Sequence, residues 1–163
     1  TESGDREGWT PLHVASWNGR LAAVRLLCQV VGRRDRLDHE GRSPLFSAAC
    51  SGQADVVRCL VQMGCDRNRP DATGRTPLIE AARMRWAGVV ACLCQMGASL
   101  DQADQQGRTA LHMAVWNNSV RVVDLLLHAG ADRNKPDWDG RTPLFLASFL
   151  GFLPVVRALV EAG

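Results

Sequence analysis

The side chains best suited to chemistry in this 163-residue chain are its six cysteines and four histidines. No two cysteines stand in a CxxC spacing, and no combination of cysteine and histidine has the spacing of a zinc site. No serine or cysteine has a plausible base beside it, and no glycine-rich loop follows a phosphate-binding pattern. We therefore expect no enzyme activity, no catalytic residues, no cofactor and no metal site.

Tryptophan and arginine offer a different chemistry, that of binding a partner. The chain has five tryptophans, and its basic residues are arginines except for Lys135. The guanidinium group forms planar pairs with carboxylates and stacks on aromatic rings, and tryptophan is enriched at binding hot spots. A GC-rich coding bias would explain the excess of arginine equally well. Which of these side chains can reach a partner depends on the elements that carry them.

A period of 33 residues organises nearly the whole chain. The hexapeptide Gly-Arg-Thr-Pro-Leu-Phe at residues 140–145, for example, matches Gly-Arg-Thr-Pro-Leu-Ile at residues 74–79. Such a period indicates one small supersecondary unit stacked on copies of itself. Five glycines mark the period: Gly8, Gly41, Gly74, Gly107 and Gly140.

The fourth copy shows what each unit builds. Thr109 is a good N-cap for a first helix, and Leu111 and Ala114 give that helix an apolar stripe. Asn118 takes the place of the glycine that ends this helix in other copies. A second helix follows, and Asp104 stands three residues before the opening glycine, which is turn chemistry. The unit is therefore predicted to be helix, turn, helix and an extended loop with a tight tip.

The repeat alignment also indicates where the cysteines lie in the fold. Cys59 and Cys92 share one position of the second helix, and Cys28 and Cys94 share another. Other copies carry leucine, valine or alanine there, so these four cysteines are predicted to be small core residues. Unpaired thiols in this number are typical of intracellular proteins, and we expect a cytoplasmic location.

The chain resembles the ankyrin repeat family. The likeness rests on the Thr-Pro-Leu-His type box, the Gly-Cys-Asp and Gly-Ala-Asp turns at residues 64–66 and 130–132, and the Asp-x-x-Gly tips. The resemblance implies an all-α repeat solenoid of antiparallel helix pairs with projecting β-hairpin loops. It also implies that the hairpin tips and first helices line a concave groove, and that His13 and His112 form structural hydrogen bonds to the threonine of their own box.

We expect one ankyrin repeat domain over residues 1–163, cut from a longer protein. Its predicted repeats span residues 8–40, 41–73, 74–106, 107–139 and 140–163.

Three copies depart from the common pattern. The first lacks the Gly-Ala-Asp turn, so an irregular second helix or loop is predicted at residues 30–34. The third carries Arg85 at the inter-helix glycine position, where a left-handed conformation costs roughly 1 kcal/mol, and Glu80 at a mostly apolar position. We expect local distortion at Arg85. The last copy exposes an apolar outer face, which predicts a covering partner.

The large aromatic side chains fall outside the repeated framework positions. By the resemblance, their positions face the concave groove, together with Arg83, which occupies the same repeat position as Trp17 and Trp116. Partial burial against neighbouring repeats is the alternative for the tryptophans. The predicted aromatic binding residues are Trp9, Trp17, Trp86, Trp116, Trp138 and Phe149.

A row of arginines follows the opening glycines. Neighbouring helix layers stack about 10 Å apart, so these arginines would form a line along the hairpin rim. The line could bind a partner with acidic and apolar anchors, or each arginine could neutralise the aspartate of its own hairpin. The predicted members are Arg42, Arg75, Arg108 and Arg141.

These features predict a non-catalytic scaffold that binds a protein or an extended peptide in its groove. Two alternatives remain, a structural spacer or intramolecular docking segment, with contact through the apolar last copy, and a binder of single-stranded nucleic acid. The net charge of +2 is too small for a typical nucleic-acid surface. No apolar run approaches the ~20 residues needed to cross a bilayer, so no membrane role is expected.

Overall fold

The computed structural model describes residues 4–30, 32 and 34–162, and within them the chain forms ten α-helices in five pairs. The first helices of the pairs are α1 (Pro11–Trp17), α3 (Pro44–Cys50), α5 (Pro77–Arg83), α7 (Ala110–Trp116) and α9 (Pro143–Phe149). The second helices are α2 (Leu21–Val30), α4 (Ala54–Gln62), α6 (Ala87–Gln95), α8 (Val120–His128) and α10 (Leu153–Glu161).

The first helices begin where local chemistry predicts. The N-cap side chains of Thr10, Ser43, Thr76 and Thr142 each accept a hydrogen bond from the backbone N–H three residues later. Proline follows each of these four caps, where a missing N–H costs nothing. The helix starts are thus fixed by residues within a single turn.

The turn at Arg85 differs from our prediction of local distortion. Arg85 does adopt a left-handed conformation, with φ of 62°. The helices on either side, α5 and α6, nevertheless have the same seven and nine residues as α3 and α4. The backbone N–H of Trp86 bonds Ala81 at 2.9 Å, as that of Gln53 bonds Ala48 at 2.9 Å. The left-handed residue is accommodated without any shift of the helices.

The first pair also differs in part from expectation. Helix α2 is not irregular but continues for ten residues through Val30, one residue longer than the second helices of the other pairs. Val31 and Arg33 lie outside the described residues, so the predicted irregularity of this loop stays a prediction.

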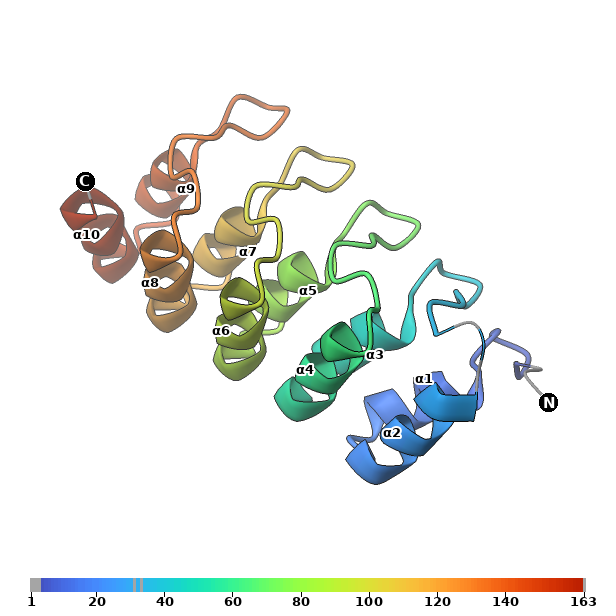
Figure 1. Ribbon diagram of the computed structural model, residues 1–163. Helices are drawn as coiled ribbons and strands as arrows, with labels where there is room; N and C mark the ends of the chain where they lie inside the picture. Colours follow the sequence, from blue (N-terminus) through green and yellow to red (C-terminus); the bar gives the residue numbers. More distant parts are fainter. Residues whose placement is uncertain (1–3, 31, 33, 163) are drawn as a thin grey trace.

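The helix pairs stack side by side into an elongated array, with the two ends of the chain at opposite ends (Figure 1). The first helices make one layer and the second helices the other. The apolar core between the two layers runs along the array, and it includes Cys28, Cys59 and Cys92, each at most 3% exposed. Cys94, which shares the repeat position of Cys28, is only partly buried. This architecture confirms the predicted all-α repeat solenoid.

A hairpin loop precedes each first helix, and all the hairpins project from the same side of the array (Figure 1). In the second hairpin the N–H of Asp38 bonds the carbonyl of Arg42 at 3.0 Å, and the N–H of Gly41 bonds Asp38 at 3.1 Å. Successive tips are joined by hydrogen bonds such as that from His39 N–H to the carbonyl of Glu7, at 3.1 Å. Within the described residues these loops form turns and contain no regular strand.

Candidate partner-binding surface

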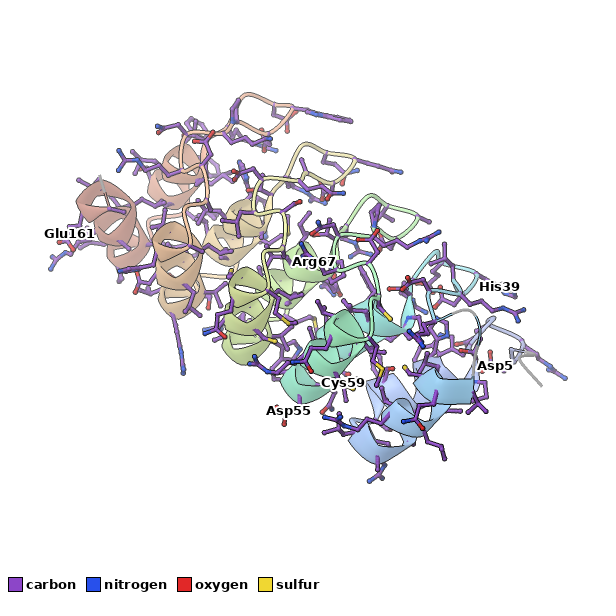
Figure 2. All side chains as sticks on the ribbon, viewed as in Figure 1. Asp5, His39, Asp55, Cys59, Arg67 and Glu161 are labelled. Carbon is purple, nitrogen blue, oxygen red and sulfur yellow. The ribbon has the colours of Figure 1, made fainter. Side chains whose placement is uncertain are left out.

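The predicted binding residues, Trp86 apart, come from the hairpins and the first helices. We call this surface the hairpin face and define it as residues 5–17, 38–50, 71–83, 104–116 and 137–149. The hairpins contact the first helices. The ring of Trp9 on a hairpin lies 5.5 Å from that of Trp17 on α1, and Arg75 on a hairpin pairs with Glu80 on α5 at 3.4 Å. Figure 2 shows Asp5 and His39 on the hairpins, whereas Asp55 and Cys59 belong to the layer of second helices.

The arginines of the hairpins are paired with the aspartates of the same hairpins. The closest contacts are 2.8 Å for Arg42 with Asp38, 3.1 Å for Arg75 with Asp71, and 2.7 Å for Arg108 with Asp104. Arg141 makes the same pair with Asp137 at 2.9 Å. Of the two roles that the sequence left open for these arginines, neutralisation within the hairpin is the one that the geometry supports.

The aspartates also hold the turn backbone. Oδ1 of Asp38 accepts hydrogen bonds from the N–H groups of Glu40 and Arg42, both at 2.9 Å, while Oδ2 accepts from Nε of Arg42 at 2.8 Å. Burial alone would raise the pKa of Asp38, but the hydrogen bonds and charge of Arg42 outweigh burial and lower that pKa. Each such arginine therefore has a structural partner within its own hairpin, and a partner with acidic anchors stays a prediction.

One position of the first helices carries the exposed aromatic side chains. Trp17, Trp116 and Phe149 are separated by multiples of the 33-residue period and are 38%, 55% and 79% exposed. The same position holds Cys50 and Arg83 in the intervening pairs. Large exposed apolar side chains are costly for solubility, and contiguous exposed apolar patches are typical of interaction sites. Trp116 and Phe149 lie on adjacent pairs, whereas Trp17 lies three pairs away from Trp116.

Trp9 contributes to this surface at its N-terminal end. Its half-buried indole lies 5.5 Å from the ring of Trp17, and the guanidinium of Arg42 lies 5.7 Å above it. This geometry is a cation–π contact. Trp9 therefore packs against both Trp17 and Arg42.

Trp86 and Trp138 each pack on a glycine of the preceding unit. The indole N–H of Trp86 donates to the carbonyl of Cys50 at 2.9 Å, and a Cβ on Gly52 would come within 2.8 Å of its ring. Trp138 lies so closely on Gly107 that a Cβ there would clash with it. Trp86 keeps 41% of its surface exposed and Trp138 keeps 76%. Both residues thus contact a neighbouring unit, and Trp138 remains largely exposed.

A buried carboxylate occupies the middle of the hairpin face. Glu80 is 3% exposed, and Nε and Nη2 of Arg83 donate to it at 2.9 and 2.7 Å. Burial would raise the pKa of Glu80, but the hydrogen bonds and charges of Arg83 and Arg75 lower it overall. The thiol of Cys50 donates to Glu80 at 3.5 Å. Arg83 is thereby held in one orientation, with its side chain 42% exposed.

The Cys50 thiol is not poised as a nucleophile. Burial and the neighbouring Glu80 carboxylate raise its pKa to about 11, so it remains protonated at neutral pH.

A second row of arginines escaped the sequence analysis. Arg34, Arg67 and Arg133 donate to backbone carbonyls near the end of the next unit's second helix, at Met63, Gly97 and Leu159. Cations at a helix C-terminus are favourable because they complement the helix dipole. The signal was present, since these arginines share one repeat position, which Leu100 occupies in the third copy.

Similarity to known proteins agrees with this geometry. The family model for ankyrin repeats matches in three copies, over residues 1–71, 63–137 and 104–163. No curated protein shows significant similarity to the chain. Among the described residues, none of the helices has both the length and the apolar character to span a bilayer. The ankyrin matches cover the whole sequence, and the chain therefore belongs to the ankyrin repeat family.

Proposed function

We propose that this chain is a protein-interaction scaffold that binds a partner protein or extended peptide on its hairpin face. Ankyrin repeats are generally protein–protein interaction modules, and proteins built from them are typically non-enzymatic. The observation that carries the proposal is the row of exposed aromatic side chains at one position of the first helices, Trp17, Trp116 and Phe149.

The mechanism is preorganisation. The aromatic side chains stand on short helices whose caps and cores are already fixed, so little conformational entropy is lost when a partner binds. A few well-placed anchors then suffice for useful affinity. The partner-contacting set in this proposal has one member outside the hairpin face, Trp86, and the hairpin-face residues Trp9, Trp17, Arg42, Arg75, Arg83, Arg108, Trp116, Trp138, Arg141 and Phe149.

We predict that replacing Trp17 and Trp116 together by alanine weakens partner binding by about thirtyfold or more, as expected for loss of two aromatic anchors. An affinity pull-down with mass spectrometry identifies the partner, and titration calorimetry measures its affinity. Leu26→Ala is the matched control, because Leu26 is 64% exposed but lies on α2. An affinity within about twofold of the parent, with the helix content intact, contradicts the assignment.

Docking through the last helix pair is a second candidate function. Leu144 and Phe145 are 39% and 54% exposed, although their counterparts Leu111 and His112 are fully buried by the following unit. The ring of Phe145 stacks on that of Phe149 at 6.4 Å. A neighbouring hollow is lined by Leu144, Leu159 and Val160. Another helical surface would cover this apolar end.

This second candidate predicts self-association or docking that depends on the aromatic pair. Light scattering should show the mass rising with protein concentration, and the double variant Phe145→Asp and Phe149→Asp should remain monomeric. A mass that stays that of the monomer at every concentration argues against self-association through this end.

A further inference from the structure

The hairpin face and the rest of the sequence carry opposite formal charges. The hairpin face holds nine carboxylate residues and six arginines, a formal charge of −3. The rest of the chain holds 13 basic and eight acidic residues, a formal charge of +5. The small net charge of the whole sequence conceals this separation. A partner of the hairpin face therefore meets a surface with an excess of carboxylates.

The excess lies at the two ends of the hairpin face. Arg42 pairs with Glu40 at 2.9 Å as well as with Asp38, and Arg141 pairs with Asp139 as well as with Asp137. The second carboxylate of each set is open to solvent, because the side chains of Glu40 and Asp139 are 68% and 70% exposed. In the middle hairpins the charges balance, since Arg75 and Arg83 face Asp71 and Glu80, and Arg108 faces Asp104.

Aromatic faces lie beside these exposed carboxylates. Trp138 is 76% exposed and stands between Asp137 and Asp139 in the last hairpin. At the other end, the exposed Glu7 lies two residues from Trp9 in the first hairpin, where the guanidinium of Arg42 already lies over the indole ring. A carboxylate next to an indole face suits a cation, which gains an ion pair and a cation–π contact at one place.

We infer that the partner segment is basic, with lysine or arginine at both ends and apolar side chains between them. The inference rests on the proposed function and adds the charge of the partner to it. One basic end meets the carboxylates of the first two hairpins, Glu7 and Glu40, the other meets that of Asp139, and the apolar centre covers Trp17 and Trp116. Four layers separate the first hairpin from the last, about 40 Å, which an extended chain covers with about twelve residues. A nucleic acid does not fit, because its phosphates would meet the same carboxylates.

The test is selection of binders from a random 12-residue peptide display library, carried out in parallel on the parent chain and on the Trp17→Ala, Trp116→Ala double variant. Peptides that only the parent retains should have a positive mean net charge relative to the input library. The strongest such peptide is then synthesised for affinity measurement. Its affinity should fall about fivefold for the Glu40→Gln, Asp139→Asn double variant, and it should fall as salt is added.

Asp55→Asn with Asp124→Asn is the matched control, since both residues lie on the second helices and the double variant removes the same charge. Its affinity for the peptide should stay within about twofold of the parent. Parent-specific peptides that are neutral or acidic, or an unchanged affinity of the Glu40→Gln, Asp139→Asn variant, overturn the inference and leave the hairpin face as a binding site. If the two selections yield the same peptides, the proposed function itself fails.

Discussion

The free energy of unfolding should fall steeply as the pH is lowered from 7 to 5. The cause is a pair of buried histidines, His13 and His112, both 0% exposed. Burial lowers the pKa of both imidazoles below the ordinary 6.5, and the acidic and carbonyl groups nearby offset this only in part. The folded chain therefore holds both rings neutral under conditions in which an unfolded chain would protonate them.

The hydrogen bonds explain why protonation conflicts with the fold. Nδ1 of His13 accepts from the backbone N–H of Thr10 at 3.1 Å, and its Nε2 lies 3.0 Å from the carbonyl of Arg42, to which it donates. His112 repeats this arrangement with Thr109 and Arg141, at 3.2 and 3.1 Å. A second proton on either ring would sit on Nδ1 and face a backbone N–H group. The predicted hydrogen bond between each histidine and its own threonine is present, with the threonine hydroxyl donating to Nδ1 at 2.8 and 2.9 Å.

The direction of the pH effect follows from proton linkage. A histidine with a lowered folded-state pKa contributes its full stability above the unfolded-state value of about 6.5. Below that pH the unfolded chain binds protons that the folded chain excludes. Each ring therefore lowers the free energy of unfolding by up to about 1.4 kcal/mol per pH unit. The carboxylates of Asp38, Asp137 and Glu80 act in a lower window, because their pKa values are lowered and their contribution is lost only below about pH 4.

Denaturant titrations at a series of pH values test this prediction. His13→Phe with His112→Phe is the informative variant, because Phe46 fills the same repeat position and is 2% exposed. The double variant should lose the dependence of the unfolding free energy between pH 6.5 and 5. Equal slopes for the variant and the parent would show that other groups carry the effect.

Each imidazole ring also bonds a carbonyl in the hairpin of the next unit. As the pH is lowered, amide hydrogen exchange should therefore accelerate first in the helix pairs at the two ends of the array.

The helices were predictable from sequence because their signals are local. A threonine cap such as Thr76 and the proline after it act within one turn, and they specify the start of α5 without knowledge of the rest of the fold. The left-handed residues that end the first helices, including Asn118 with φ of 50°, act over the same short range. The proline recurs in four copies and the capping and left-handed residues in all five, and this repetition made the register unambiguous.

The candidate site was predictable only in outline. The repeat register identified Trp17 and Trp116 as variable residues outside the framework, and both are exposed. It could not decide whether Arg108 was free, because the spacing of four positions from Asp104 allows a pair or a solvated side chain equally well. That choice depends on burial of the aspartate, which is 3% exposed in the folded chain.

The 33-residue repeat pattern did not predict the contacts between neighbouring units. Trp86 reaches the carbonyl of Cys50 across 36 residues, and nothing in the repeat signals that a tryptophan at this position will pack on Gly52. The difference in charge between the hairpin face and the rest of the chain was also not predicted, because it requires knowing which residues share a face. Both features arise from stacking and not from the repeated unit itself.

The second large effect is expected at Glu80. Glu80→Ala should lower the free energy of unfolding by about 2 kcal/mol, because it leaves a cavity and removes the partner that holds Arg83. Loss of a fully buried pair would cost about 3–5 kcal/mol, but the partly exposed Arg83 regains water when it is released. Arg75 keeps its pair with Asp71.

Glu80→Met separates charge from volume and is the decisive comparison. Met113 occupies the same repeat position in the fourth copy and is 6% exposed, so a methionine fits this environment. Replacement of a buried ionic group by an apolar side chain of similar size is often neutral or stabilising, and the change in unfolding free energy should stay within about 1 kcal/mol. Denaturant titration of both variants at pH 7 measures the difference. If Glu80→Met is as unstable as Glu80→Ala, the carboxylate itself stabilises the array, and its pair with Arg83 is worth more than the apolar contacts that replace it.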